Sequence, residues 1–385
     1  MKDEKKAPKL RFKGFTDDWE QCKLGDVCEE VSGNNGNVKG LPILTISAAN
    51  GWMNQKDRFS QVIAGNELKK YTLLKKGHLA YNHGNSKQAK YGTVFVQNLY
   101  DQALVPRVYH SFKMKTENNP YYVEYYFATK KLDRELARLV TSGARMDGLL
   151  NINKKDFFKI KFEVPTPVEQ SLIGTILQKL DQTITLHEEK KHQLERLKSA
   201  LLQKMFADKS GYPDIRFEGF SDEWEQCKLG DVAKINSGKD YKGLQPGKIP
   251  VYGTGGYMLS VNDKLSDIDA IGIGRKGTID KPYYLNAPFW TVDTLFYVTP
   301  RGTVDISFMF PLFKNINWKR YDESTGVPSL SKNTIKKIRV SFPQNNEQVK
   351  IGDLFQKITQ IITLHDQKLN LLKLVKQSLL QKMFI

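Results

Sequence analysis

Two long stretches of the chain carry apolar residues at the spacing of an α-helix. In residues 166–210, and again in residues 344–385, apolar side chains recur at intervals of three and four positions or their sums. That spacing places them on one face of a helix, and a second element must cover this face. The residues of the two apolar faces are Leu180, Ile184, Leu194, Leu201 and Met205, and then Ile358, Ile362, Leu369, Leu372, Leu379 and Met383.

The first of these helices has clear start and stop signals. Thr166 offers a hydroxyl cap, Pro167 suits the first helical position, and Glu169 is the acidic partner of a capping box. Gly211 and Pro213 end the helical pattern. We therefore expect two helices of roughly 40 residues, each about 60 Å long.

Two helices with similar apolar faces bury them most simply against each other, so the pattern predicts an antiparallel coiled coil. The first helix leads into the second half of the chain, and a pseudo-twofold relation between the halves would follow. His187 and His365 occupy equivalent positions on the two faces. We expect them to pack and hydrogen-bond between the helices rather than to bind a ligand.

The segments before the helices are also repeated. RFKGFTDDWEQCKLGDV at residues 11–27 returns as RFEGFSDEWEQCKLGDV at residues 216–232. The middles of the two halves, residues 33–142 and 238–324, share little sequence. A repeat of this length indicates duplication of a whole domain, because solenoid repeats run to about 20–50 residues.

The divergent middles are typical of short strands separated by turns, with one helix late in each. The predicted helices cover residues 119–140 and residues 307–316, and Pro311 threatens the continuity of the second. The fold class is therefore α+β, with two domains of mixed strands and helices joined by two long antiparallel helices. The expected segments are a first domain at 1–165, a helix at 166–210, a second domain at 211–343 and a helix at 344–385.

The composition indicates a polyanionic partner. The formal net charge is +17 and the pI is about 9.4, which favours nucleic acid or an anionic membrane surface. No apolar run approaches the roughly 18 residues that span a membrane, and the start MKDEKKAPKL lacks a signal-peptide core. Cys22, Cys28 and Cys227 form neither a disulfide set nor a metal-binding pair, so we expect a cytoplasmic protein.

Both middles contain segments suited to DNA. Residues 68–100 hold six lysines and no acid, interleaved with Tyr, His and Asn. Lysines neutralise phosphates, and Asn and Arg side chains can read base edges. A solvated basic loop is the alternative for any single lysine. The candidate DNA-binding residues are Asn82, His83, Lys87 and Lys90 in the first half and Lys239, Tyr241, Lys242, Thr254, Arg275 and Lys276 in the second.

Three patterns imitate catalytic or cofactor sites. GIGRKG at residues 272–277 fits the dinucleotide-binding glycine pattern but precedes TIDKPYYL rather than a helix. NPYY at residues 119–122 is better explained as a helix cap than as a methyltransferase motif. The histidines lack the spacing and companions of a zinc site. We expect no catalytic residue and no metal ligand.

Together, these features resemble the specificity (S) subunit of type I restriction-modification enzymes, the HsdS family. The resemblance covers essentially the whole chain. It rests on the two WEQCKLGDV segments, on IGIGRKGTI at residues 271–279, on the paired segments DGLLNINKKDFFKIKFEVP and TGVPSLSKNTIKKIRVSFP, and on the EQ-x-x-IG helix starts.

The resemblance implies that each divergent middle is a target recognition domain for one half of a split DNA sequence. The helices would then set the spacer, at roughly 10 base pairs between half-site centres, and dock modification subunits. The implied partners are double-stranded DNA, two modification (methyltransferase) subunits and two restriction (translocase and nuclease) subunits, without a membrane. The chain itself would need no cofactor, because S-adenosylmethionine, ATP and Mg would be bound by the partner subunits.

Two other classes of protein remain as alternatives. A single-chain DNA methyltransferase or nuclease with its own recognition domains would need cofactor motifs, and we find none in the sequence. A duplicated DNA-binding repressor would fit the positive net charge but would not explain the two long helices.

Overall fold

The structure, a computed structural model, describes residues 7–34, 40–59, 65–84, 86–115, 117–141, 149–208 and 210–385. The chain divides into two compact units. Unit 1 contains residues 1–186 and 369–385, and unit 2 contains residues 187–368. The expected domain boundaries fall at the starts of two long helices, but each helix contributes residues to both units, so the helices are not separate domains.

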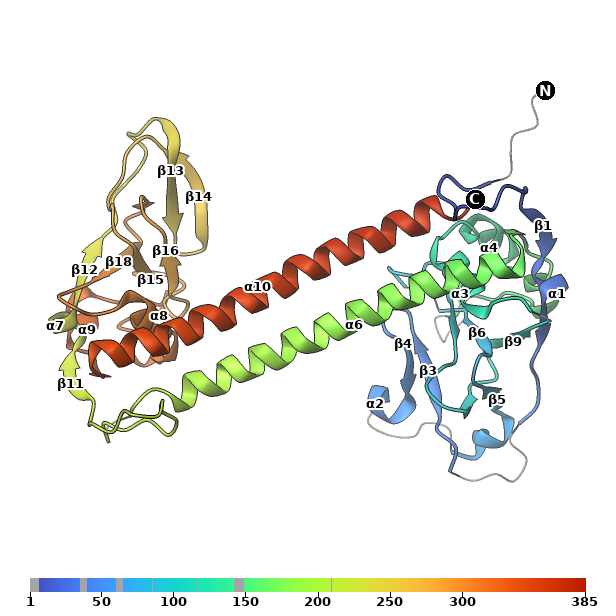
Figure 1. Cartoon of the computed structure of the whole chain (residues 1–385), viewed down its shortest axis with the longest axis horizontal. Helices are drawn as coiled ribbons and strands as arrows, with labels where there is room; N and C mark the ends of the chain where they lie inside the picture. The colour runs from blue at the N-terminus through green and yellow to red at the C-terminus, as the bar shows by residue number, and fades with distance from the viewer. Residues whose placement is uncertain are drawn as a thin grey trace. The chain divides into compact units, whose positions relative to one another are not determined.

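The two long helices that the apolar pattern predicted are α6 (Pro167–Lys204) and α10 (Asn345–Lys382), each of 38 residues (Figure 1). The first ends at Lys204 and not at the expected residue 210. In unit 1, the end of α10 lies against α6, with Lys376 Nζ 2.6 Å from an Asp181 carboxylate oxygen. Tyr125 donates a 2.8 Å hydrogen bond to the same carboxylate. This ion pair and hydrogen bond fix both helices to the body of unit 1.

In unit 2, the two helices run antiparallel. Lys191 lies 2.7 Å from Asp366, and Lys198 donates a 2.6 Å hydrogen bond to Thr359. Higher residue numbers on α6 therefore meet lower residue numbers on α10. The predicted antiparallel pairing of the helices is confirmed.

His187 and His365 meet between the two helices, as the sequence predicted. Their Nδ1 atoms are 2.8 Å apart and their ring centroids 4.9 Å apart. One of the two nitrogens must carry the proton and donate it to the other. Partial burial and the neighbouring His365 lower the pKa of His187, which keeps that ring neutral and preserves the hydrogen bond.

Unit 1 is built from short strands around an antiparallel sheet. In its described part, the sheet has the order β2-β9-β6-β7, and the pairs β1-β10, β3-β4 and β5-β8 lie beside it. Its strands are β1 (Glu20–Lys23), β2 (Cys28–Glu30), β3 (Leu44–Ser47), β4 (Gly51–Asn54), β5 (Thr72–Lys75), β6 (Leu79–Asn82), β7 (Thr93–Val96), β8 (Gln102–Val105), β9 (His110–Met114) and β10 (Lys161–Val164). Its shorter helices are α1 (Leu24–Val27), α2 (Gln55–Phe59), α3 (Pro120–Ala128), α4 (Asp133–Leu139), α5 (Lys154–Phe157) and the 3-10 helix η1 (Gly65–Lys70).

Unit 2 repeats the central sheet of unit 1. Its sheet has the order β12-β18-β15-β16, a second sheet has the order β14-β13-β17, and β11 pairs with β19. The strands are β11 (Glu225–Lys228), β12 (Ala233–Ser237), β13 (Pro246–Gly253), β14 (Gly256–Val261), β15 (Ala270–Gly274), β16 (Tyr283–Leu285), β17 (Trp290–Thr291), β18 (Leu295–Pro300) and β19 (Arg339–Phe342). The shorter helices are α7 (Leu229–Val232), α8 (Ile306–Asn315), α9 (Lys332–Lys337) and the 3-10 helix η2 (Trp318–Tyr321).

The helices of the two middles differ from expectation in opposite ways. The single helix expected at residues 119–140 is two helices, α3 and α4, because Lys130 adopts a left-handed backbone with φ of 65°. The helix around residues 307–316 is continuous as α8 despite Pro311. Asp305 caps its first turn by accepting from Ser307 N at 2.7 Å, which helps to hold the helix past the proline.

The WEQCKLGDV repeat builds the same structure twice. Its Trp is buried and meets an aromatic ring edge-on. The ring centroids are 5.9 Å apart for Trp19 and Tyr122 of α3, and 5.7 Å apart for Trp224 and Phe308 of α8. The residues EQCK of the repeat form β1 in unit 1 and β11 in unit 2, which pair antiparallel with β10 and β19. The repeated sequence is therefore a frame that joins each sheet to the start of a long helix.

The EQ-x-x-IG helix starts complete this frame. The prediction that Glu169 closes a capping box is wrong, because its buried carboxylate instead pairs with Arg11, with Nε–Oε1 and Nη2–Oε2 distances of 2.7 and 2.9 Å. Arg216 and Glu347 form the same bidentate pair in unit 2, at 2.7 and 2.8 Å. Thr166 does cap the helix, accepting from Glu169 N at 3.4 Å.

The neighbouring glutamines fix the next element onto each helix. The Gln170 carbonyl accepts from Asn119 N at 3.1 Å, and the Gln348 carbonyl accepts from Asp305 N at 2.9 Å. Each glutamine therefore ties the start of α3 or α8 to the start of α6 or α10. Gly352 allows this close approach, because a Cβ at that position would lie 2.7 Å from Ser307 Cβ.

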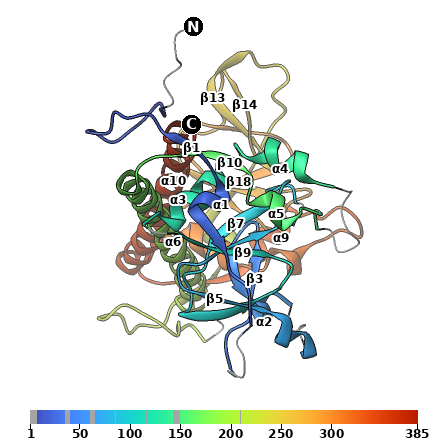
Figure 2. The same ribbon diagram turned by 90° about the vertical axis from the view of Figure 1, so that its right-hand side faces the viewer.

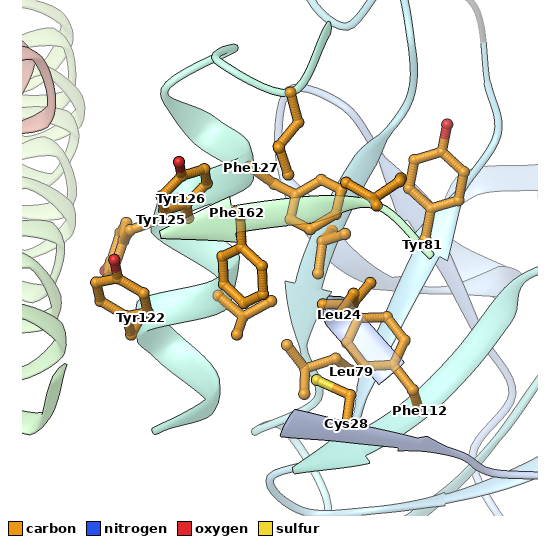
Figure 3. Packing of buried hydrophobic residues seen from close by; sticks show 14 of the residues in the cluster. Leu24, Cys28, Leu79, Tyr81, Phe112, Tyr122, Tyr125, Tyr126, Phe127 and Phe162 are labelled. Atoms are coloured by element: carbon orange, nitrogen blue, oxygen red, sulfur yellow. The ribbon is translucent and has the colours of Figure 1, made fainter. Parts of the chain in front are cut away.

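The core of unit 1 is rich in aromatic rings and includes the end of the chain. Tyr122, Tyr126 and Phe162 pack together between α3 and β10 (Figure 3). Phe384, just beyond α10, is buried and stacks on Tyr122 with ring centroids 5.4 Å apart. None of the helices in the described residues is both long and apolar enough to cross a membrane.

Candidate nucleic-acid interface

Two loops that carry candidate DNA-binding residues occupy equivalent places in the two units. The β6–β7 loop follows Asn82, and the β15–β16 loop follows Gly274, in sheets of the same strand order. Each loop forms an isolated backbone bridge to the segment that precedes a short helix, Gly84 with Leu149 and Lys276 with Ser329. The duplicated frame therefore presents different loop sequences at one position of the fold.

In unit 2, this loop exposes two cations. Arg275 and Lys276 are both exposed, and Gly277 turns the chain with φ of 87°, a conformation that favours glycine. Backbone hydrogen bonds hold the loop in place: Leu330 N donates to Arg275 O at 2.9 Å and Gly277 N to Pro328 O at 2.8 Å. The two cations are thus carried on a fixed turn.

A pocket of about 340 Å³ opens beside this turn. Its polar lining consists of three cations and three hydroxyls, from Arg275, Lys276, Lys332, Ser237, Ser329 and Ser331. Phe296 forms part of its wall, with the Arg275 guanidinium and the Lys332 ammonium each 6.0 Å from the ring centroid. An anionic group is the natural occupant of such a lining.

In unit 1, two of the candidate residues are turned inward. Asn82 is half-buried and donates to Ile46 O at 3.2 Å while accepting from Gly84 N at 3.1 Å. His83 is only 5% exposed, and its ring lies 3.1 Å from Leu150 O and 4.0 Å, centroid to centroid, from that of His110. These two side chains hold the loop in place and do not lie exposed on its surface. The sequence had suggested exposed, DNA-binding side chains, because both residues stand among lysines.

The adjoining His110 is also a core residue. Burial, together with His83, lowers the pKa of His110 to about 3, so this ring is neutral at physiological pH. Its Nε2 lies 3.1 Å from Ile152 O. The paired imidazoles thus join β6 and β9 to the segment before α5.

Lys87 and Lys90 are the exposed cations of the β6–β7 loop. The Lys90 ammonium lies 5.4 Å from the centroid of the Tyr91 ring. Both residues keep the charge and the exposure that phosphate contacts need.

The remaining candidates of unit 2 surround the hairpin β13–β14, which projects from the rest of its unit (Figures 1 and 2). Lys239 and Lys242 are exposed on the segment that leads into β13. Tyr241 is half-buried and packs beneath the hairpin, so its ring is structural. Thr254 lies half-buried in the turn of the hairpin.

The sequence did not point to three further surface residues. Tyr257 and Met258 on β14 are 63% and 48% exposed, and Lys332 lies in the basic pocket. Two adjacent large side chains directly after a Gly-rich turn were the available signal for the first two. Lys332 had no comparable signal, because it reaches the pocket through a contact with a turn more than fifty positions earlier in the chain.

The predicted apolar faces of the long helices lie inward. All eleven residues are buried or half-buried. Leu201 and Met205 pack into the core of unit 2, and Leu379 and Met383 into that of unit 1. The carboxyl-terminal end of each face thus anchors its helix into one of the two cores.

Two of the patterns that imitate catalytic or cofactor sites, GIGRKG and NPYY, form a turn and a helix cap. The glycines of GIGRKG lead from β15 through a turn into β16, not into a helix. Asn119 caps α3, accepting from Tyr121 N at 2.9 Å, as its position suggested. No group of three or more His, Cys, Asp or Glu side chains that could hold a metal ion occurs in the described part of the chain.

Comparison with protein families identifies two matching segments. Residues 16–196 and 221–374 each match the family described as type I restriction modification DNA specificity domain. The matched segments include both frames, both divergent middles and most of both long helices.

Curated relatives support the same family. The chain is 28% identical over 122 residues to the type I restriction enzyme MjaVIII specificity subunit of Methanocaldococcus jannaschii. It is 27% identical over 127 residues to the MjaIX specificity subunit of the same organism. Each alignment covers 31% of this chain and spans only 28% of the relative's length.

The fold also resembles a solved structure. The crystal structure of the S subunit of a type I restriction-modification system from M. genitalium superimposes with a TM-score of 0.68 at 18% identity. The match covers 98% of this chain and 99% of that chain. At this level of identity the likeness shows that the two chains share a fold.

Proposed function

The chain belongs to the family of type I restriction-modification DNA specificity domains, and on this premise we propose that it is the non-catalytic subunit that selects the DNA target of such a complex. Unit 1 and unit 2 each bind one half of a bipartite sequence in double-stranded DNA. The observation that carries this proposal is that one duplicated frame presents two unlike basic loops, β6–β7 and β15–β16, at the same position of the fold.

The charges of the exposed loops support DNA as the partner. Lys87 and Lys90 in unit 1 and Arg275 and Lys276 in unit 2 are exposed, in a chain of net charge +17. Lysines contribute affinity through phosphates, and arginine can pair bidentately with guanine. The unlike loops explain how the two half-sites can differ in sequence.

The two long helices would carry the second part of the function. They carry exposed apolar side chains, including Leu186, Leu197, Leu364, Leu371 and Leu374. Exposed apolar surface of this kind marks a protein interface. We assign it to two modification subunits, with two restriction subunits joining the complex through them.

The test of independent recognition is a domain exchange. Residues 33–142, some of which lie outside the described residues, are replaced with the equivalent segment of another specificity subunit. Methylome sequencing of a strain carrying the chimera should show one half of the methylated sequence changed and the other half retained. If both halves change together, the two units do not recognise DNA independently.

The alternative class, a single-chain methyltransferase or nuclease, is tested with the purified full chain. We expect neither methyl transfer from S-adenosylmethionine nor DNA cleavage with ATP and Mg, because these cofactors belong to the partner subunits. Methyl transfer by the chain in the absence of any partner would establish the alternative.

The spacer role of the helices predicts a change in target spacing. Met205 and Phe206 are buried in the core of unit 2, so an insertion must lie in the middle of α6 and be matched in α10. Four residues in each helix add about 6 Å at 1.5 Å per residue. Since DNA rises about 3.4 Å per base pair, the unread gap should lengthen by one or two base pairs while both half-sequences stay the same. An unchanged gap in the methylome would contradict a spacer role.

A further inference from the structure

We propose that the pocket formed by Arg275, Lys276 and Lys332 binds one phosphodiester group of the DNA backbone. This inference rests on the proposed function and deepens it, because it assigns a specific part of the DNA to a specific pocket. It also adds Lys332 to the residues that bind DNA.

The lining of the pocket matches a group that only accepts hydrogen bonds. Three cationic side chains line a space of about 340 Å³ together with Ser237, Ser329 and Ser331, and the Ser331 hydroxyl already donates to Glu323. Among the described residues that line this space, no side chain is an amide or a carboxylate, so its charged side chains act only as hydrogen-bond donors. Phosphate oxygens are acceptors only, and clustered cationic donors bind them strongly.

The cations of the pocket are not neutralised within the chain. In the part of the chain that the structure describes, none of Arg275, Lys276 and Lys332 forms an ion pair with a carboxylate within 4.0 Å. The nearest acids are used elsewhere. Glu323 accepts hydrogen bonds from Ser331 and Thr334, and Asp322 accepts from Ser329 N at 2.9 Å.

These two acids give the pocket a fixed shape. The bonds that Asp322 accepts from Ser329 N and Glu323 accepts from the Ser331 hydroxyl hold the segment that carries Lys332 in place. Its Leu330 N also bonds to Arg275 O at 2.9 Å, which joins the segment to the turn. A site arranged in advance loses little conformational entropy when the phosphate binds.

At the corresponding place in unit 1, the residues equivalent to Arg275 and Lys332 are a buried histidine and a lysine that is paired with a glutamate. His83 follows the last residue of β6 as Arg275 follows the last residue of β15, and it is buried against Leu150 O. Lys154 begins α5 as Lys332 begins α9, but its ammonium lies 2.7 Å from a Glu30 carboxylate oxygen. Lys154 is therefore a matched control for Lys332.

The experiment compares K332A with K154A in the full chain. DNA binding is measured by fluorescence anisotropy as a function of KCl concentration, on a duplex with the bipartite target and on one without it. Loss of one phosphate contact should reduce the slope of log K against log salt by about 0.9. We expect this reduction for K332A on both duplexes, full recovery of the slope with K332R, and no change for K154A.

The outcomes separate the pocket from the proposed function. If the unchanged chain does not distinguish the two duplexes, the proposed function fails. If it does, but K332A keeps its slope and affinity, the phosphate pocket alone is overturned. If K332A instead relaxes the preference for one base pair, the pocket reads a base and the phosphate assignment is wrong. Circular dichroism melting of K332A and K332R confirms that both variants are folded.

Discussion

Replacing Glu347 with alanine should destabilise unit 2 by about 3–5 kcal/mol, the range for breaking a buried ion pair. The side chain of Glu347 is 1% exposed and that of Arg216 is 14% exposed, and two hydrogen bonds of 2.7 and 2.8 Å join them. The guanidinium keeps its charge without its partner, because an arginine is not deprotonated in a protein; in the intact pair, the hydrogen bond to Glu347 raises the pKa of Arg216 further. In the variant, this charge would remain in a largely buried place without a partner.

A double variant tests this explanation. Changing both Arg216 and Glu347 to methionine removes both charges and leaves no unpaired group. Replacing a whole buried pair by apolar residues is often neutral or stabilising, so the double variant should recover most of the stability that E347A loses. Together with the single variants R216M and E347M, the double variant gives the coupling free energy of the pair.

The assay is hydrogen exchange followed by mass spectrometry, which reports the opening free energy of each unit separately. Peptides from β11 and the first turns of α10 should lose protection in E347A, while peptides from β1 and the first turns of α6 should not. E169A should give the reverse pattern, because Arg11 and Glu169 form the same pair in unit 1. A loss below about 1 kcal/mol in E347A would contradict the reasoning, since that value is typical of exposed pairs.

Two further predictions concern single side chains. Gly352→Ala should destabilise unit 2 despite a gain of about 1 kcal/mol in helix propensity, because its Cβ would collide with the Ser307 side chain; thermal melting checks it, and an increase in Tm would contradict it. Burial raises the pKa of Glu124 to about 7, so this group contributes stability that is fully present below pH 4.5 and is lost as the pH rises through 7. Glu124→Gln should remove that part of the pH dependence, and an unchanged difference in stability between pH 5 and pH 8 would contradict the assignment.

The frame of each unit could be predicted from the sequence because it depends on local signals. A hydroxyl cap and a proline at the first helical position marked the start of α6, and an apolar spacing of three and four marked both long helices, although α6 ends at Lys204 and not at residue 210. The repeat itself showed which segments must have the same structure. The Arg11–Glu169 pair was missed, since its two residues lie 158 positions apart.

The common sheet of the two middles could not be predicted. β6 and β15 occupy the same place in sheets of the same order, yet LAYN and AIGIG share no pattern beyond being apolar. A buried strand of four or five residues requires only suitable apolar side chains, and many sequences meet that requirement. Similarly, the burial of His83 depends on His110 and Leu150, which no local pattern connects to it.

The burial of Phe384 in unit 1 determines the order in which the chain can fold during synthesis. Unit 2 is one continuous segment, so its core is complete once residue 368 has left the ribosome. Unit 1, although it is made first, must wait for Met383 and Phe384 before Tyr122 receives its stacking partner. Until then its aromatic core has an open side, which is a surface for chaperones and proteases. A chain truncated before Met383 would therefore leave the ribosome with unit 2 folded and unit 1 open to degradation.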